Sequence, residues 1–215
     1  MAAGGENYNV HIPDFMLTTK LARSQIRRRR FDKTIFEKIV MPEETRQFIL
    51  SLIGGRDEDL ERWGINNFYK GRGAVFLAYG LPGTGKTLTG EGLAEYLGRA
   101  CYRVGSTDLG WDSSNFEDHF KAIIQKTERW NAVTIIDEAE AILRTRDPRN
   151  FESSTRVEAV LRNLEWLQRG IIWFTTNRQF ELDFAIDSRI RAKIHFPKFT
   201  AEQRRAVWKV TIPPE

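Results

Sequence analysis

The most regular feature of the chain is an alternation of short apolar runs with amphipathic stretches, beginning near residue 74. The apolar runs have the length of single strands and cover Ala74–Tyr79, Cys101–Val104, Val133–Ile136, Ile171–Thr175 and Lys193–Phe196. Between them, apolar residues recur at the three- and four-residue spacing of a helix face. Strands that alternate with helices predict a five-stranded parallel sheet with helices on both sides. Ligands of such sheets bind at the carboxyl ends of the strands.

A few residues with known positional preferences predict where individual helices begin. Pro42 suits a first helical position, so we expect a helix to start there. A capping box pairs a helix-capping hydroxyl with an acidic or amide side chain three residues later. This spacing predicts two further helix starts, at Ser114 with Glu117 and at Thr155 with Glu158.

The clearest motif in the chain follows the first apolar run. The residues Gly80, Leu81, Pro82, Gly83, Thr84, Gly85, Lys86 and Thr87 match the pattern G-x-x-x-x-G-K-[ST] without a mismatch, between a predicted strand and a predicted helix. Glycines let the backbone N–H groups surround phosphate oxygens. We expect Lys86 to contact the β- and γ-phosphates of ATP and the Thr87 hydroxyl to bind Mg²⁺. Gly90 and Gly92 lie in the predicted helix, where each costs about 1 kcal/mol relative to alanine, and the sequence gives no firm reason for them.

An acidic pair, Asp137-Glu138, ends the third apolar run about fifty residues after the loop. Carboxylates at this end of a parallel strand are expected to lie near the bound phosphates. We predict that Asp137 binds Mg²⁺ and that Glu138 is the general base that polarises the attacking water. The predicted nucleotide-binding residues are therefore the loop, the following Leu88, and Asp137. Without the loop upstream, the pair would be interpreted as a solvated turn.

Asn177 ends the fourth apolar run, in the segment Thr175-Thr176-Asn177. At this end of the sheet its amide is expected to contact the γ-phosphate or to orient the attacking water. The alternative is an asparagine that simply ends a strand in a turn.

A final segment makes a family resemblance specific. Leu182–Arg191 contains the pattern Leu-Asp-x-Ala-x-x-Ser-Arg, and it follows the phosphate loop, the Asp-Glu strand and the Thr-Thr-Asn strand in that order. This arrangement resembles the core of AAA+ ATPases. Its amino-acid sequence most resembles that of the AAA-type domains common in fungal proteins of uncharacterised role. The segment Phe36–Glu44 is similar to the opening segment of those domains. The likeness covers about residues 35–210 and implies an α/β, three-layer αβα P-loop NTPase fold.

The resemblance also implies catalytic roles outside the loop and strand motifs. Arg189 is expected to reach a nucleotide bound by a neighbouring subunit of a homo-oligomer, for example a ring, with Arg191 as second choice. The alternative is a surface arginine that pairs with Asp187. Trp111 lies where many members carry an aromatic residue that grips a translocated polypeptide, although a packed or loop tryptophan is an equal alternative.

The chain departs from the family pattern after the fifth apolar run. We expect a basic, flexible leader over residues 1–34, an AAA+ nucleotide-binding domain over 35–199, and the start of a truncated helical lid over 200–215. The lid of the family continues for several more helices and carries a second sensor arginine. This departure bears on the predictions of efficient hydrolysis and of ring assembly, and it does not affect the predicted sites of the main domain.

Composition and charge restrict the cellular setting. No apolar run has the roughly 18 residues that a membrane span needs. The single cysteine, Cys101, cannot form an internal disulfide, which fits an intracellular chain, cytoplasmic or nuclear. The formal charge of +4 belongs to residues 1–35, where seven Lys/Arg face three Asp/Glu. The run Arg27–Arg30 favours a solvated arm, with docking on nucleic acid or nuclear import as alternatives.

Together these patterns predict an ATPase that uses ATP and Mg²⁺ to remodel a protein or another macromolecule as an oligomer. One alternative is an AAA+ ATPase that handles nucleic acid through the basic leader. Another is a switch or scaffold that binds ATP without appreciable turnover. A small-molecule kinase is less favoured, because no lid for a second phosphate is evident.

Overall fold

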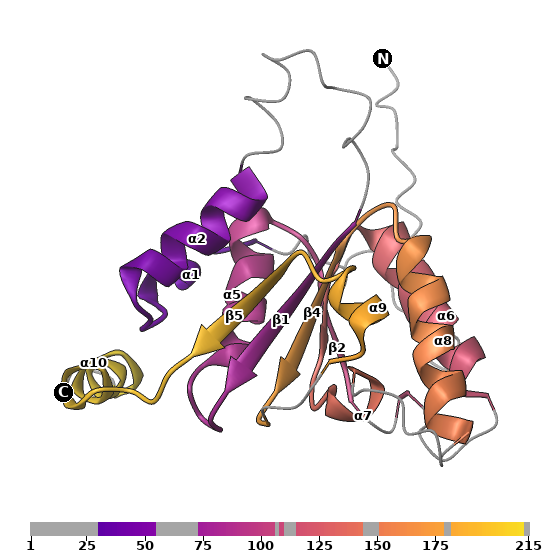
Figure 1. The fold of residues 1–215 in the computed structure, drawn as a ribbon. Coiled ribbons are helices and arrows are strands. Elements are labelled where there is room, and N and C mark those ends of the chain that lie inside the picture. The colour runs from indigo at the N-terminus through magenta and orange to yellow at the C-terminus, as the bar shows by residue number, and fades with distance from the viewer. Residues whose placement is uncertain are drawn as a thin grey trace, which may run out of the picture. The chain divides into compact units, whose positions relative to one another are not determined.

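The computed structural model describes residues 30–54, 73–105, 108–109, 115–143, 151–178 and 182–212. They form a central parallel sheet of five strands in the order β2-β3-β4-β1-β5 (Figure 1). The strands span Ala74–Gly80 (β1), Cys101–Val104 (β2), Val133–Ile136 (β3), Ile171–Thr176 (β4) and Ala192–Phe196 (β5). The predicted strands are thus confirmed to within one residue at each end, and so is the α/β class.

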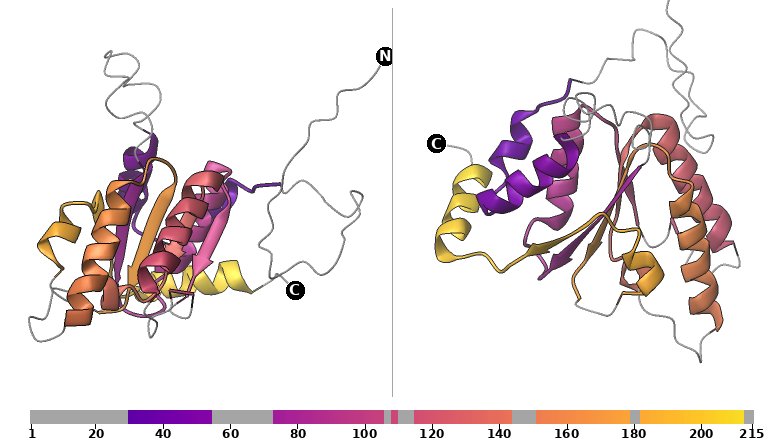
Figure 2. Two further views of the ribbon diagram at one scale, coloured as in Figure 1. Left: turned by 90° about the vertical axis from the view of Figure 1, so that its right-hand side faces the viewer. Right: turned by 45° about the horizontal axis from the view of Figure 1, so that its top comes forward.

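Helices cover both faces of this sheet, as Figures 1 and 2 show. One face carries Thr34–Lys38 (α1), Glu43–Gly54 (α2) and Lys86–Leu97 (α5), and the other carries Phe116–Trp130 (α6), Glu140–Leu143 (α7), Phe151–Glu165 (α8) and Phe184–Asp187 (α9). The last described helix is Ala201–Thr211 (α10), after β5. Among the described residues, no helix combines the length and apolar character needed to cross a bilayer.

The core is divided between the two faces by the alternation of side chains along each strand. In β1, Val75 and Leu77 belong to the cluster under α6 and α8, whereas Phe76 belongs to the cluster under α1, α2 and α5. In β4, Phe174 and Trp173 divide in the same way, and both are fully buried. Because the central strands are apolar on both faces, the sheet is an interior layer that presents only its strand ends to ligands.

The predicted helix starts need three corrections. The helix expected from Pro42 begins one residue later, with the Pro42 carbonyl accepting from the Arg46 N–H, so Pro42 is the residue before the helix. Ser114 lies outside the described residues, and Asn115 holds the cap position of α6. Thr155 is not a cap, because α8 already includes Phe151. A pattern of two residues is therefore compatible with a helix start but does not fix one, and helix boundaries commonly differ by a residue or two.

One capping box is present where none was predicted. The Thr200 hydroxyl accepts from the Gln203 N–H at 3.2 Å, and the Gln203 side chain accepts from the Thr200 N–H at 2.9 Å. This reciprocal pair starts α10, whose residues are all at least partly exposed.

The packing of α5 accounts for its two glycines. A Cβ at Gly90 would lie 2.8 Å from Trp173 Cδ1 and 3.1 Å from Ile135 Cδ1, and one at Gly92 would lie 2.4 Å from Ile39 Cδ1. The helix therefore packs on β3, β4 and the end of α1 at a distance that a side chain would prevent. This close approach brings the start of α5 against the carboxyl ends of the strands.

We expect Gly90→Ala to lower the free energy of unfolding by about 1–3 kcal/mol, because the buried Trp173 ring has to shift. The gain in helix propensity, about 1 kcal/mol, offsets only part of this cost. Gly92→Ala is the matched control, since its neighbour is the flexible end of Ile39 and moves more easily. Urea denaturation of both variants measures the difference. Equal stability of Gly90→Ala and the parent protein would contradict the packing explanation.

Candidate functional site

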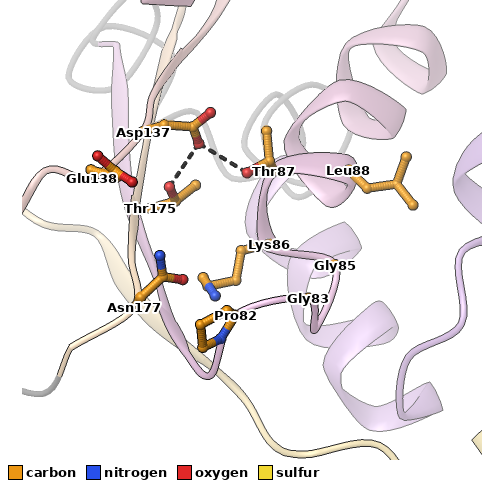
Figure 3. Close-up of a pocket in the computed structure, with 10 residues that line it drawn as sticks. All are labelled: Pro82, Gly83, Gly85, Lys86, Thr87, Leu88, Asp137, Glu138, Thr175 and Asn177. Atoms are coloured by element: carbon orange, nitrogen blue, oxygen red, sulfur yellow. Dashed lines mark hydrogen bonds between the residues drawn. The ribbon is translucent and has the colours of Figure 1, made fainter. Parts of the chain in front are cut away.

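A pocket of about 470 Å³ opens at the carboxyl edge of the sheet (Figure 3). Its lining consists of Pro82, Gly83, Gly85, Lys86, Thr87, Leu88, Asp137, Glu138, Thr175 and Asn177. The loop after β1, the first turn of α5, the end of β3 and the end of β4 supply these residues. The structure therefore brings most of the predicted site residues together, although they are spread over almost a hundred positions.

The loop from Gly80 to Gly85 depends on backbone angles that suit glycine. Gly80, Gly83 and Gly85 have φ angles of 143°, 74° and 92°. A Cβ at Gly80 would also lie 2.1 Å from the carbonyl oxygen of Phe196, because β1 and β5 pair there. The loop thus turns sharply out of the sheet and delivers Lys86 and Thr87 to the first turn of α5.

The Lys86 side chain is held inside the loop by backbone carbonyl oxygens of the loop. Its ammonium group donates to the carbonyl oxygens of Gly80 at 2.9 Å and of Leu81 at 2.7 Å. The residue is only 6% exposed, and burial lowers the pKa of Lys86, partly offset by the charges of Asp137 and Glu140. A cation that has lost much of its hydration in this way gains from a nearby anion. The arrangement therefore favours binding of a negatively charged group in the loop.

The first turn of α5 is tied to the sheet at Lys86, and local hydrogen bonds hold the backbone on either side of it. The buried indole of Trp173 donates to the Lys86 carbonyl oxygen at 3.0 Å. The Thr89 hydroxyl donates to the Gly85 carbonyl oxygen at 2.8 Å, and the Thr84 hydroxyl donates to that of Leu81. These bonds fix the positive end of the helix at the pocket, where its free N–H groups attract anions.

Asp137 is the most connected carboxylate of the pocket. One of its oxygens, Oδ1, accepts from the Thr87 hydroxyl at 2.9 Å and from the Thr175 hydroxyl at 2.7 Å. The other, Oδ2, accepts from the Arg103 guanidinium at 3.1 Å. Sequence reasoning missed Thr175 and Arg103. Each is a polar residue near the carboxyl end of a largely apolar strand beside β3. This position could have identified them only if the order of the strands had been known.

Glu138 has an unusual backbone. Its φ of 56° is in the left-handed region, which few residues other than glycine adopt. Such conformations cost about 1–3 kcal/mol and are concentrated at functional sites. The next residue, Ala139, donates its N–H to the Thr175 carbonyl oxygen at 2.9 Å, which anchors the turn to β4. The turn leaves the exposed Glu138 side chain in the lining of the pocket, to which Asn177 contributes from the end of β4.

Arg189 lies outside the lining of this pocket. Its guanidinium donates to the carbonyl oxygen of Ala185 at 2.8 Å and to the hydroxyl of Ser188, and it forms an ion pair with Glu165 at the end of α8. The alternative, an ion pair within the chain, is thus present, but its carboxylate is Glu165 and not Asp187, which pairs with Lys193 at 2.8 Å. Arg191, the second choice, is exposed at the start of β5.

Two sequence-based hypotheses fall on parts of the chain without structural description. Trp111 lies outside the described residues, and so do Arg27–Arg29 of the basic run. Their proposed contacts with a polypeptide or with nucleic acid therefore stay predictions.

A second, small hollow has Thr84 of the loop in its lining. Most of the other lining residues are apolar and come from the segment before α2, such as Met41 and Pro42, and from the end of β5 and the segment after it, such as Phe196 and Phe199.

Comparisons with known proteins agree with the geometry of the site. The family described as "ATPase family associated with various cellular activities (AAA)" matches residues 76–198, which is more than half of the chain and includes every pocket residue.

Curated relatives align over a similar region. The 26S proteasome regulatory subunit 6B homolog of Dictyostelium discoideum is 29% identical over 148 residues, which is 62% of this chain and 36% of the relative. A katanin p60 ATPase-containing protein of Rattus norvegicus is 26% identical over 163 residues, covering 69% and 33%. Fidgetin-like protein 1 of Homo sapiens is 29% identical over 140 residues, covering 61% and 21%. The match thus spans about a third or less of the length of these relatives.

Proposed function

The chain belongs to the AAA family of ATPases, and we propose that it binds ATP together with Mg²⁺ in the pocket at the carboxyl edge of the sheet and hydrolyses it. One observation carries the proposal. Lys86 and Thr87 of the loop share a single pocket with Asp137, Glu138 and Asn177 from two neighbouring strands. A phosphate-binding cation, a metal-binding pair and a candidate base are the parts that phosphoryl transfer to water requires.

The triphosphate is proposed to lie along the loop, with Lys86 serving the β- and γ-phosphates. The buried ammonium of Lys86 and the N–H groups of the first turn of α5 are the attractive groups there. Gly83 and Gly85 leave open space where side chains would stand, so the phosphates can approach the backbone closely. Leu88, which is half exposed, lines the pocket beyond the loop.

The donor set of the pocket suits Mg²⁺. The Thr87 hydroxyl and an Asp137 carboxylate oxygen lie 2.9 Å apart, and hard oxygen donors of these two kinds are those that Mg²⁺ prefers. Thr87 and Asp137 would hold the ion, and Thr175 keeps the carboxylate in place by a hydrogen bond. When bound, Mg²⁺ supplies positive charge that neutralises the phosphate oxygens.

Hydrolysis is assigned to Glu138 and Asn177. The Glu138 carboxylate is proposed to accept a proton from the attacking water, and the Asn177 amide is proposed to contact the γ-phosphate or to orient that water. The left-handed turn at Glu138 supports this role, because a strained backbone at the pocket is a cost with no benefit to the core.

ATP hydrolysis is proposed to drive the remodelling of a polypeptide or another macromolecule by a homo-oligomer of this chain. Membership of the family and similarity to proteins of the proteasome and katanin kinds support this proposal. Arg189 is proposed to act on the nucleotide of a neighbouring protomer, because within its own chain it lies outside the pocket lining.

We expect Lys86→Ala to weaken binding of a fluorescent ATP analogue by at least about 100-fold. Lys86 serves two phosphates, and a hydrogen bond to a charged group contributes about 1.5–3 kcal/mol. Lys86→Met keeps the aliphatic stem and is expected to lose as much, whereas Lys121→Ala, at an exposed position of α6, keeps parental affinity. Fluorescence titration in Mg²⁺ measures the affinities. Parental affinity in a folded Lys86→Met protein would refute the assignment of the pocket.

A further inference from the structure

Arg103 connects the metal-binding carboxylate of the pocket to a second carboxylate on another element. It lies on β2, the edge strand next to β3, with its backbone in register with Ile135. One end of its guanidinium is 3.1 Å from Asp137 Oδ2, and the other is 3.2 Å from Glu91 Oε1 of α5. The proposed roles in phosphate binding and in hydrolysis do not involve Arg103 or its two ion pairs.

The two oxygens of Asp137 are occupied by different kinds of donor. Oδ1 accepts two neutral hydroxyls, from Thr87 and Thr175, which already fix the orientation of the carboxylate. Oδ2 accepts, among the described residues, only from the charged guanidinium of Arg103. The hydroxyls on Oδ1 therefore orient the carboxylate, and the permanently charged Arg103 pairs with Oδ2.

A guanidinium at this distance opposes a metal ion at the same carboxylate in two ways. Through Oδ2 it offsets the negative charge of the carboxylate whose Oδ1 would hold the ion, and its own positive charge repels the ion through a short separation. Arginine stays protonated at all physiological pH values, and the hydrogen bond to Asp137 raises the pKa of Arg103 further. Its side chain is 60% exposed, so solvent screens the repulsion and the effect is modest.

We propose that Arg103 is an internal competitor for Mg²⁺ at Asp137, and that it sets the Mg²⁺ concentration at which the pocket takes up metal with nucleotide. The inference rests on the proposed function, since it concerns metal binding at the same site. Glu91 gives the guanidinium a second carboxylate to pair with when Asp137 is engaged by a metal. Arg103 thus acts through the charge of Asp137, and it is not part of the pocket lining itself.

The test is a titration of Mg²⁺ into protein with a fixed concentration of a fluorescent, non-hydrolysable ATP analogue. We expect Arg103→Gln to lower the half-saturating Mg²⁺ concentration by roughly 3- to 10-fold, the size expected for a screened charge acting on a divalent ion. Arg103→Lys keeps the positive charge and is expected to stay near the parent. In EDTA, where no metal competes, Arg103→Gln is expected to bind the analogue within about threefold of the parent, because exposed charges contribute little.

Arg162→Gln is the matched control. Arg162 has the same charge and nearly the same exposure, 61%, and pairs with Glu117 at 2.8 Å on the opposite face of the sheet. Its substitution removes one positive charge from the chain and is expected to leave the Mg²⁺ requirement unchanged.

Each outcome decides a separate point. An unchanged or increased Mg²⁺ requirement in Arg103→Gln would overturn the competition, the increase meaning that Arg103 assists the carboxylate. Equal shifts in Arg103→Gln and Arg162→Gln would also overturn it, since net charge alone would then explain them. A parent protein that binds the analogue without any dependence on Mg²⁺ would instead contradict the proposed metal site itself.

Discussion

Replacing Arg189 by alanine is expected to lower the rate of ATP hydrolysis by about 10³–10⁵-fold while ATP binds with parental affinity. An arginine supplied from a neighbouring protomer stabilises the charge of the transition state, and its loss affects turnover far more than binding. In the structure Arg189 is held by Glu165 and by the Ala185 carbonyl oxygen, outside its own pocket. Steady-state hydrolysis at several protein concentrations, with a parallel binding titration, measures both quantities.

Mixing experiments separate action on a neighbour from action within one chain. Arg189→Ala has an intact pocket, and Glu138→Gln has an intact arginine, so a mixed oligomer is expected to regain part of the activity. Glu165→Gln, which frees Arg189 from its partner within the chain, is expected to keep or raise activity. Activity that is independent of protein concentration, with no recovery on mixing, would show that the chain hydrolyses ATP alone.

Replacing Glu138 by glutamine is expected to reduce hydrolysis by about 10²–10⁴-fold, the usual contribution of a general base. The amide keeps the shape of the side chain and removes its ability to accept a proton. ATP affinity is expected to stay near the parental value, because Lys86 and Asp137 are untouched. Single-turnover hydrolysis and a binding titration of the same preparation measure the two effects.

Glu140→Gln is the control for this substitution. Glu140 is the next carboxylate along the chain, two residues later in α7, and it is not part of the pocket lining. Its replacement is expected to change the rate by less than about tenfold. Parental activity in Glu138→Gln would assign the base elsewhere. A parent protein without hydrolysis at any concentration would favour the switch or scaffold alternative.

The strands could be predicted closely because most are short apolar runs bounded by polar or small residues, and β5 alternates buried and exposed positions. Val133–Ile136, for example, is fully buried and ends at the charged pair Asp137-Glu138. The same feature located the candidate site, since strand ends and the glycine-rich loop are local patterns. The helix starts were less predictable, because Thr155 satisfies a local capping pattern although the helix begins four residues earlier, at Phe151.

The partners of the predicted residues could not be read from the sequence. Thr175 and Arg103 reach Asp137 only because β4 and β2 are its neighbours on either side, and strand order is a property of the whole sheet. The pairing of Arg189 with Glu165 likewise joins the segment after α9 to the end of α8. Local patterns therefore identified the residues of the site, whereas their contacts required the three-dimensional arrangement.

The contact between Gly90 and Trp173 also restricts how related sequences can change. The indole fills the space that a side chain at position 90 would take, and its N–H holds the carbonyl oxygen of Lys86. A substitution at either position alone leaves a clash or a void beside the phosphate loop, whereas a paired exchange of small and large residues restores the volume. Positions 90 and 173 are therefore expected to covary across homologues, although neither of these two residues lines the pocket.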